Sequence, residues 1–309
     1  MKDKRLDKLC EAIDSAVKES CSESITVSFS GGIDSTLVAF LANKYCNVEL
    51  IAVGIPKSHD LEAAKTAAEM IGMKLTIVEV EPREMVKEGS NMQKEIDLKA
   101  IEVEFMLPFW IAAKRTTNKI LMCGQGADEL FGGYARFRKD DAVTDLSKEV
   151  SDLNIRLIDR ELKIAEFFGL ELSCPYLSEL VVNTANTFSE KERIGDVGKV
   201  PLRQAAQELG LPKKIAERKK KAAQYGSGSQ RAIRDIIKHK IVFEINFTSS
   251  DIAKSVAQAT EPENIGWVET NVIDNKIKAT IKAESLGSLR KATEDFMACL
   301  SVAEKIAKQ

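Results

Sequence analysis

Apolar residues follow two different patterns along this chain, and the pattern changes near residue 240. Before that point, short apolar runs alternate with segments in which apolar residues recur every three to four positions. The runs lie at residues 25–29, 48–54, 75–80 and 119–123. Strands that alternate with helices predict an α/β fold with a parallel, doubly wound sheet. Ligands bind such sheets beyond the carboxyl ends of the strands, so the residues after these runs are the candidates for chemistry.

Beyond residue 240, apolar and polar residues alternate, as in a strand with one buried face. Glu261-Pro262-Glu263 is expected to end the helix that follows this strand. The pattern predicts a small α+β domain at 239–309 behind a larger domain at 1–238. We expect its elements in the order βαββα: a strand at 241–247, a helix at 251–259, a hairpin of 266–273 and 276–283, and a long helix from residue 286.

The composition describes an ordinary globular protein and excludes several kinds of function. The 309 residues are 44% hydrophobic and 30% charged, with a net charge of −2, which argues against nucleic-acid binding by bulk charge. No apolar run is long enough to span a membrane, so we expect a cytoplasmic protein. Six scattered cysteines without a C-x-x-C pair indicate free thiols. Two histidines make a His-based zinc site or a Ser-His-Asp triad improbable, which leaves acid–base chemistry to carboxylates or lysine.

A glycine-rich turn connects the first apolar run to a helix. It reads Ser30-Gly31-Gly32-Ile33-Asp34-Ser35. Two glycines permit a tight turn, and the amides of the first helical turn then favour an anion. Asp34 fits an anion site only if a cation such as Mg²⁺ bridges it to phosphate. The same turn could also be an ordinary strand–helix connection.

Two stretches carry a family resemblance. The hexapeptide at 30–35 resembles the pyrophosphate loop of the ATP pyrophosphatases, without the G-K-[ST] of a Walker loop. The stretch C-G-Q-G-A-D-E-L-F-G-G-Y at 123–134 resembles the G-E-G-S-D-E-x-F-G-G-Y signature of the asparagine synthetase C-terminal domain, and residues 53–64 are similar to that family too. The resemblance covers roughly residues 20–235. It implies an adenine nucleotide alpha hydrolase-like fold and an ATP-dependent enzyme that activates a carboxylate as an adenylate.

The resemblance also implies a set of site residues. It assigns Asp34 and Asp128 to Mg²⁺ on the pyrophosphate of ATP, and Lys220, in the run 218–221, to the catalytic lysine that stabilises charge on the α-phosphate. The remaining nucleotide-binding positions that it implies are Ser28, Ser30, Gly31, Gly32, Ser35, Val53 and Gly124.

Three positions depart from the family pattern. Gln125 stands where asparagine synthetases carry glutamate, and an amide cannot accept a proton there. In the segment 169–178, which resembles G-x-E-x-R-x-P-F-L-D, Ser173 replaces arginine and Ser178 replaces aspartate. The loss of a charged fork weakens the case for aspartate as the substrate. Asp159 and Glu171 remain candidate acid–base groups, and either could instead be a structural carboxylate.

The tail resembles a second family. Residues 261–263 and S-L-R-K-A at 288–292 are similar to the small dimerising subunit of the KEOPS tRNA-modification complex. This resemblance implies a homodimer and a tRNA-related partner. An unrelated α+β packing domain is the alternative.

Three functions follow from these patterns. The first is an AMP-forming amide ligase of the asparagine synthetase type, acting on small carboxylate and amine substrates. No glutaminase domain precedes the loop and no cysteine follows Met1, so ammonia, another amine or a glutaminase partner is expected to supply nitrogen. The second is an adenylating enzyme that modifies tRNA. The third is a non-catalytic nucleotide-binding scaffold.

Overall fold

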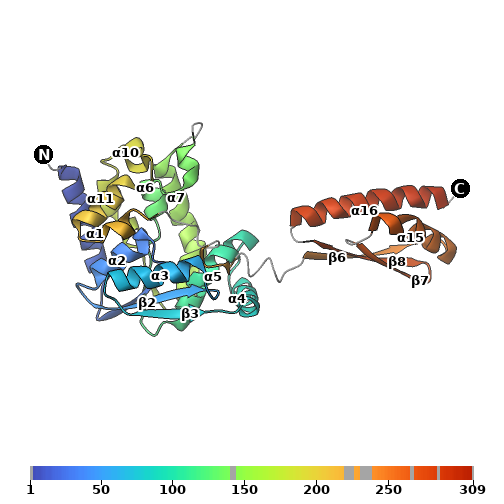
Figure 1. The fold of residues 1–309 in the computed structure, drawn as a ribbon, viewed down its shortest axis with the longest axis horizontal. Helices are drawn as coiled ribbons and strands as arrows, with labels where there is room; N and C mark the ends of the chain where they lie inside the picture. The colour runs from blue at the N-terminus through green and yellow to red at the C-terminus, as the bar shows by residue number, and fades with distance from the viewer. Residues whose placement is uncertain are drawn as a thin grey trace. The chain divides into compact units, whose positions relative to one another are not determined.

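The computed structural model describes residues 3–139, 144–218, 226–229, 239–264, 268–283 and 286–307. The chain divides into two compact units, Met1–Ala232 and Ile233–Gln309 (Figure 1). Within the described part of the chain, no helix combines the length and apolarity that crossing a bilayer requires.

A parallel five-stranded sheet forms the centre of the first unit, with the strand order β3-β2-β1-β4-β5. The predicted fold class is therefore confirmed. The sequence runs had indicated four of these strands, and the short fifth strand completes the edge beside β4. The strands are β1 (Ser24–Ser28), β2 (Asn47–Gly54), β3 (Leu75–Glu79), β4 (Ile120–Met122) and β5 (Glu171–Ser173).

The strand order reverses between β1 and β4. The chain adds β2 and β3 on one side of β1, and then returns to add β4 and β5 on the other. Val27 of β1 pairs with Met122 of β4 near the carboxyl ends of both strands. The loops that leave these two strands diverge because they lead to opposite edges of the sheet, which opens a crevice between them. The topology thus places the segments after residues 28 and 122 at one binding position.

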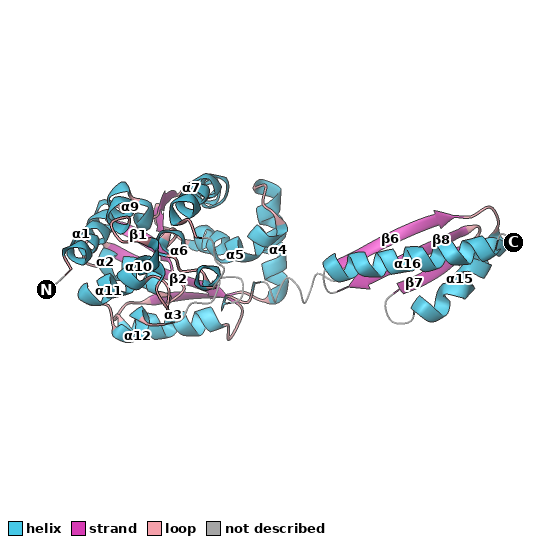
Figure 2. Ribbon diagram, turned by 90° about the horizontal axis from the view of Figure 1, so that it is seen from above, coloured by secondary structure: helices cyan, strands magenta, loops and turns pink. Residues whose placement is uncertain are grey.

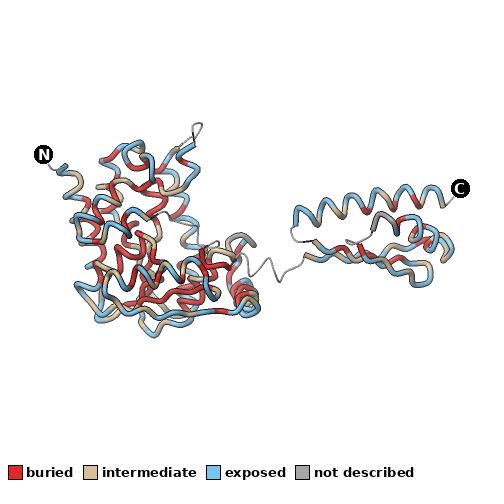
Figure 3. Tube along the Cα trace, viewed as in Figure 1, coloured by how far each residue is buried: buried red, intermediate tan, exposed pale blue. Residues whose placement is uncertain are grey.

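Helices surround this sheet and enclose a core that includes its central strands (Figures 2 and 3). The first half carries α1 (Lys4–Glu19), α2 (Ile33–Ala42), α3 (His59–Met70), α4 (Pro82–Glu95) and α5 (Ala100–Arg115). The second half carries α6 (Ala127–Phe131), α7 (Leu146–Leu157), α8 (Lys163–Phe167), α9 (Glu179–Ala185), α10 (Glu190–Ile194), α11 (Val200–Glu208) and α12 (Lys213–Ala216).

A π-helical turn, Ile158–Leu162, joins α7 to α8. The sequence pattern had predicted a helix through 151–168, and the helical backbone does continue from α7 to α8. The widened turn changes which side chains face the interior, and turns of this kind are frequent at functional sites.

The second unit has the predicted βαββα order. Its elements are β6 (His239–Asn246), α15 (Ser250–Asn264), β7 (Val268–Ile273), β8 (Lys276–Ala283) and α16 (Leu286–Ala307). The antiparallel sheet has the order β6-β8-β7, and its apolar side packs on both helices (Figure 2). One prediction was wrong: α15 continues to Asn264, so residues 261–263 do not end it. Proline removes one backbone donor from a helix, and here that loss falls in the last turn.

Candidate active site

A cavity of about 580 Å³ opens at the reversal point of the sheet. The segments after β1 and β4, the end of β2, helix α5 and the π-turn contribute to its wall. Its size suits a nucleotide-sized ligand. The structure brings eight residues predicted from the sequence into this wall: Ser28, Ser30, Asp34, Ser35, Val53, Gly124, Gln125 and Asp128.

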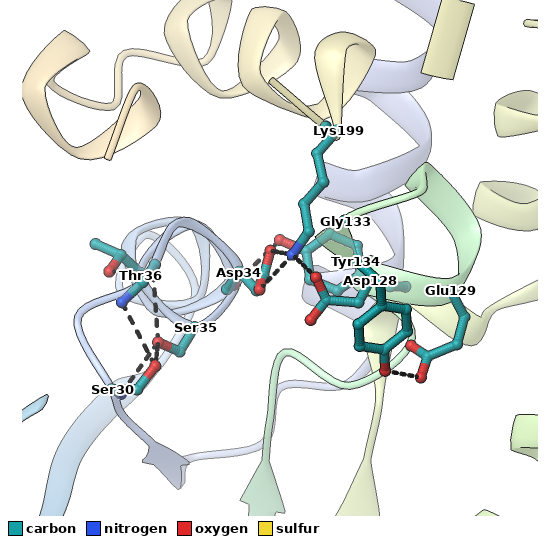
Figure 4. A network of polar contacts seen from close by, with 12 residues as sticks. Ser30, Asp34, Ser35, Thr36, Asp128, Glu129, Gly133, Tyr134 and Lys199 are labelled. Carbon is teal, nitrogen blue, oxygen red and sulfur yellow. Dashed lines mark hydrogen bonds and ion pairs between the residues drawn. The ribbon is translucent and has the colours of Figure 1, made fainter. Parts of the chain in front are cut away.

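Glycine is required at the turn between β1 and α2. Gly31 has φ +68°, and a Cβ on it would lie 2.7 Å from the backbone nitrogen of Ala64 in α3. Gly32 follows as the N-cap of α2. The backbone N–H of Ser30 donates to Ser35 Oγ at 3.2 Å, which closes the turn over the start of the helix (Figure 4). The turn therefore presents hydroxyl groups and the first amides of α2 to the cavity.

Two aspartates and a lysine meet beside this turn. Asp34 lies in the first turn of α2 and Asp128 in the first turn of α6. The Lys199 ammonium donates to both carboxylate oxygens of Asp34 at 2.7 Å, and it also lies 2.7 Å from Asp128 Oδ1 (Figure 4). Each of the three residues is at most 9% exposed. The two predicted aspartates therefore converge, and the cation between them comes from a third part of the chain.

Two further glycines allow this convergence. A Cβ on Gly124 would lie 2.7 Å from Asp34 Cβ, so the segment after β4 can approach α2 only with glycine at this position. A Cβ on Gly133 would overlap both Asp128 Oδ1 and Lys199 Cε. The glycines thus leave room for the buried side chains of the cluster.

The residues of this cluster fit a divalent cation. Carboxylate oxygens are the donors that Mg²⁺ prefers, and one or two carboxylates together with phosphates and water are its usual set in nucleotide sites. The ammonium of Lys199 shows that the space between Asp34 and Asp128 accommodates positive charge. Among the described residues, no group of three or more His, Cys, Asp and Glu side chains could hold a metal alone. The phosphates of a bound nucleotide would have to complete the coordination.

A second charge cluster lines the cavity at the π-turn. Arg160 Nε donates to Glu161 Oε2 at 3.3 Å, its Nη1 lies 3.7 Å from Glu102 Oε1, and its guanidinium lies 5.3 Å from the ring centre of Phe105. Arg160 and Glu161 are both buried. Burial raises the pKa of Glu161, although the charge of Arg160 acts in the opposite direction. This carboxyl group is therefore poised to hold a proton more readily than an exposed glutamate.

Gln125 and Glu129 also line the cavity. Glu129 is buried and accepts a hydrogen bond of 2.6 Å from the Tyr134 hydroxyl (Figure 4). The neutral amide of Gln125 thus lies in a wall that also holds buried carboxylates. The loss of a glutamate at position 125 does not leave the cavity without groups that can accept a proton.

Other predicted residues lie elsewhere. Asp159 does not line the cavity; its exposed side chain accepts a hydrogen bond from Lys163 Nζ at 2.8 Å. Glu171 is exposed at the start of β5 and is likewise absent from the cavity wall. In the same π-turn, Arg160 and Glu161 are buried and line the cavity instead. Neither carboxylate lines the cavity, and their acid–base roles stay predictions.

The two serines that depart from the family pattern lie outside the cavity wall, and the predicted lysine lies beyond a described arginine. Ser178 is the N-cap of α9, and its hydroxyl accepts a bond from Val181 N–H. Ser173 ends β5 and does not line the cavity. Lys220 lies outside the described residues. Arg218 is described, and its Nη1 donates to the backbone oxygen of Gly31 at 2.9 Å. The chain therefore passes beside the glycine turn just before the predicted lysine.

Sequence reasoning missed Lys199 and Glu161. Lys199 stands alone between Gly198 and Val200, and no periodicity or charge run singles it out. The one available signal was Gly133, because a second glycine after Gly132 indicates a close approach by something from another part of the chain. Glu161 could not be separated from its neighbours without the π-turn.

Comparisons with known proteins agree with this geometry. The family model "Asparagine synthase" matches residues 8–157 and 146–260, and the model "Transcription factor Pcc1" matches residues 240–308. A Methanocaldococcus jannaschii protein, named as a putative glutamine-hydrolysing asparagine synthetase 1, is 32% identical over 290 residues, covering 77% of this chain and 53% of that protein. The glutamine-hydrolysing asparagine synthetase B of Escherichia coli is 26% identical, covering 74% and 46%.

The chain spans about half the length of the curated relatives that it matches. Among solved structures, the NMN synthetase of Francisella tularensis aligns with 71% of this chain and 77% of its own, at 13% identity and a TM-score of 0.41.

Proposed function

Because the chain belongs to the asparagine synthase family, with a Pcc1-type domain at its C-terminal end, we propose that it is an ATP-dependent, AMP-forming amide ligase. The observation that carries the proposal is the convergence of Asp34 and Asp128 beside the glycine turn. Two carboxylates around one cation, next to amides that favour an anion, make a site for the pyrophosphate part of a nucleotide.

The reaction that this site supports has two steps. A carboxylate oxygen of the acceptor forms a bond to the α-phosphorus of ATP, while the bond from that phosphorus to the bridging oxygen breaks and pyrophosphate leaves. An amine then forms a bond to the acyl carbon, and AMP leaves with the electron pair of the broken bond. Asp34 and Asp128 would hold Mg²⁺, which neutralises charge on the phosphates when it is bound.

The chain's own residues would divide the remaining work. The amides and hydroxyls of the turn at 30–35 bind and orient the pyrophosphate. Backbone at Ser28, Val53 and Gly124 faces the adenosine. Gln125 orients the acceptor without exchanging a proton. The proton released by the amine passes to Glu129 or Glu161, the two buried glutamates of the wall. The cationic step at the α-phosphate stays assigned to Lys220 on the family resemblance alone.

ATP–pyrophosphate exchange tests the proposal. Purified full-length chain is incubated with ATP, Mg²⁺, labelled pyrophosphate and one acceptor at a time, beginning with aspartate and other small carboxylates. Exchange that depends on a small carboxylate is the expected result. Ammonia and glutamine are then added separately as nitrogen donors, and AMP and amide are quantified. No exchange with any acceptor contradicts the proposal and leaves a nucleotide-binding scaffold.

The Pcc1-type domain supports a second candidate, in which tRNA carries the acceptor. Exchange that appears only when tRNA is added distinguishes this function from the first.

We further propose that residues 1–238 form the catalytic domain and that 239–309 form a dimerisation domain. Sedimentation of the full chain, compared with a chain that ends at residue 238, tests this division.

A further inference from the structure

Lys199 is held at the aspartate pair from two directions. Its backbone N–H donates to the Phe131 carbonyl at the end of α6, and the residue adopts a left-handed conformation with φ +57° at the N-cap of α11. That conformation is unfavourable for a lysine, and the surrounding structure has to enforce it. From there the side chain passes over Gly133, where any larger residue would overlap its Cε. The ammonium is thus delivered to one defined point.

The ammonium lies where a bridging metal would have to lie. It contacts both oxygens of Asp34 and one oxygen of Asp128, each at 2.7 Å. A Mg²⁺ ion that bridges the two carboxylates must approach an oxygen of each to about 2.1 Å, which puts it in the space between them. Two cations cannot share this space without strong repulsion, because it is buried and poorly screened.

We propose that Lys199 is a built-in competitor of the divalent cation: it pairs with Asp34 and Asp128 until the metal arrives with its phosphates, and it then withdraws. The inference rests on the proposed function, since it assumes that these aspartates bind a metal. Lys199 is a positioning residue in this scheme. It keeps two buried carboxylates together that would otherwise repel each other, and it makes metal binding without phosphates weak. The site thereby favours a metal–nucleotide complex over the free metal ion.

Mn²⁺ binding in the absence of nucleotide provides the test. Electron paramagnetic resonance measures free Mn²⁺ during titration of the full-length wild type, Lys199→Met and Lys199→Arg. Methionine keeps most of the length of the side chain without its charge, so we expect at least about tenfold tighter Mn²⁺ binding. Arginine keeps the charge, so Lys199→Arg should bind Mn²⁺ as weakly as the wild type. Equal or weaker binding by Lys199→Met overturns the proposal.

Thermal unfolding gives a second readout on the same proteins. With EDTA, Lys199→Met should unfold at a lower temperature than the wild type, because its two buried aspartates lose the ammonium that contacts both of them. Mn²⁺ should raise its midpoint more than that of the wild type, since a ligand of the native state stabilises according to its affinity. The double variant Lys199→Met, Asp34→Asn should lose the gain in affinity. Retention of that gain would also overturn the proposal, because the metal would then bind elsewhere.

A measurement on the wild type alone covers the case in which Lys199→Met does not fold. Reductive methylation, followed by mass spectrometry, reports how accessible the Lys199 amine is with and without saturating Mn²⁺. We expect increased labelling with Mn²⁺, and unchanged or reduced labelling contradicts withdrawal. The outcome is separable from the proposed function. A chain that shows Mn²⁺ competition but no ATP–pyrophosphate exchange refutes the ligase and keeps the competitor, whereas exchange without competition does the reverse.

Discussion

Two charge clusters beside one cavity contain the same kinds of charge but differ in construction. Each contains one cation and two carboxylates. In the first, Lys199 reaches Asp34 across 165 positions of sequence, and its ammonium lies 2.7 Å from the carboxylate oxygens of Asp34 and from Asp128 Oδ1. In the second, Arg160 pairs with its neighbour Glu161 and more distantly with Glu102, at 3.3 to 3.7 Å. The first cluster depends on tertiary structure, and the second depends largely on one helical turn.

The difference separates two kinds of buried charge. The aspartates sit at the N-terminal turns of α2 and α6, where helix dipoles and a tight ammonium compensate their charge. Glu161 lies inside a π-turn, and its contacts to Arg160 are too long to offset burial fully, so its pKa is raised. We infer that the first cluster is built to hold a cation next to phosphate. The second is built for a group that can take up a proton.

The largest expected effect comes from removing charge in the first cluster. Asp34→Asn and Asp128→Asn should each reduce ATP–pyrophosphate exchange by about 10³-fold, because an amide is a poor ligand for Mg²⁺ beside a triphosphate. The rate of exchange at saturating ATP and Mg²⁺ measures this directly. Asp152→Asn is the matched control, since Asp152 lies exposed on α7 and outside the cavity, and it should leave the rate unchanged.

Circular dichroism must show that both aspartate variants keep their helices. A folded Asp128→Asn protein with a normal exchange rate would mean that the convergence of Asp34 and Asp128 stabilises the fold and does not serve catalysis. The first cluster would then not differ in function from the second.

The next effect concerns stability and the second cluster. Arg160→Met removes the cation between Glu161 and Glu102, so it leaves buried carboxylate without compensation. We expect the free energy of unfolding at pH 7 to fall by about 3 kcal/mol. Urea titration measures the change. Arg156→Met, four residues earlier and exposed on α7, is the control and should change it by about 0.5 kcal/mol or less. If both variants change the free energy of unfolding equally, solvent screens the charge of Glu161 and the carboxylate does not depend on Arg160.

The two clusters also differ in how well they can be predicted from the sequence. Apolar periodicity predicted four of the five strands of the first unit and the element order of the second, and the reversal of the sheet placed the segments after β1 and β4 together. The family motifs pointed to Asp34 and Asp128. Each aspartate lies in the first helical turn after a loop that contains glycines, so both positions can be recognised from the local sequence.

The rest could not be predicted, because it depends on distant packing. Lys199 reaches the aspartates through a left-handed residue and a gap over Gly133, and neither leaves a pattern in the sequence near 199. Asp159 and Glu161 lie in the same π-turn, but Asp159 is exposed while Glu161 is buried and lines the cavity. The sequence near these residues does not show which of the two faces inward.

The smallest expected effect is a gain in the free energy of unfolding when Glu161 of the second cluster is replaced. The folded-state pKa of Glu161 is raised, so between its unfolded value and the raised value the folded protein binds more protons than the unfolded one. The contribution of Glu161 to the free energy of unfolding is therefore fully present below its unfolded pKa of 4.5, and it is lost as pH rises through its folded pKa. Glu161→Gln mimics the protonated form, and it should raise the free energy of unfolding at pH 7 by about 1 kcal/mol, with the gain vanishing near pH 4. Urea titrations at both pH values measure this difference. A loss of stability at pH 7 would show that Arg160 compensates Glu161 as fully as Lys199 compensates Asp34, and the two clusters would then be electrostatically alike.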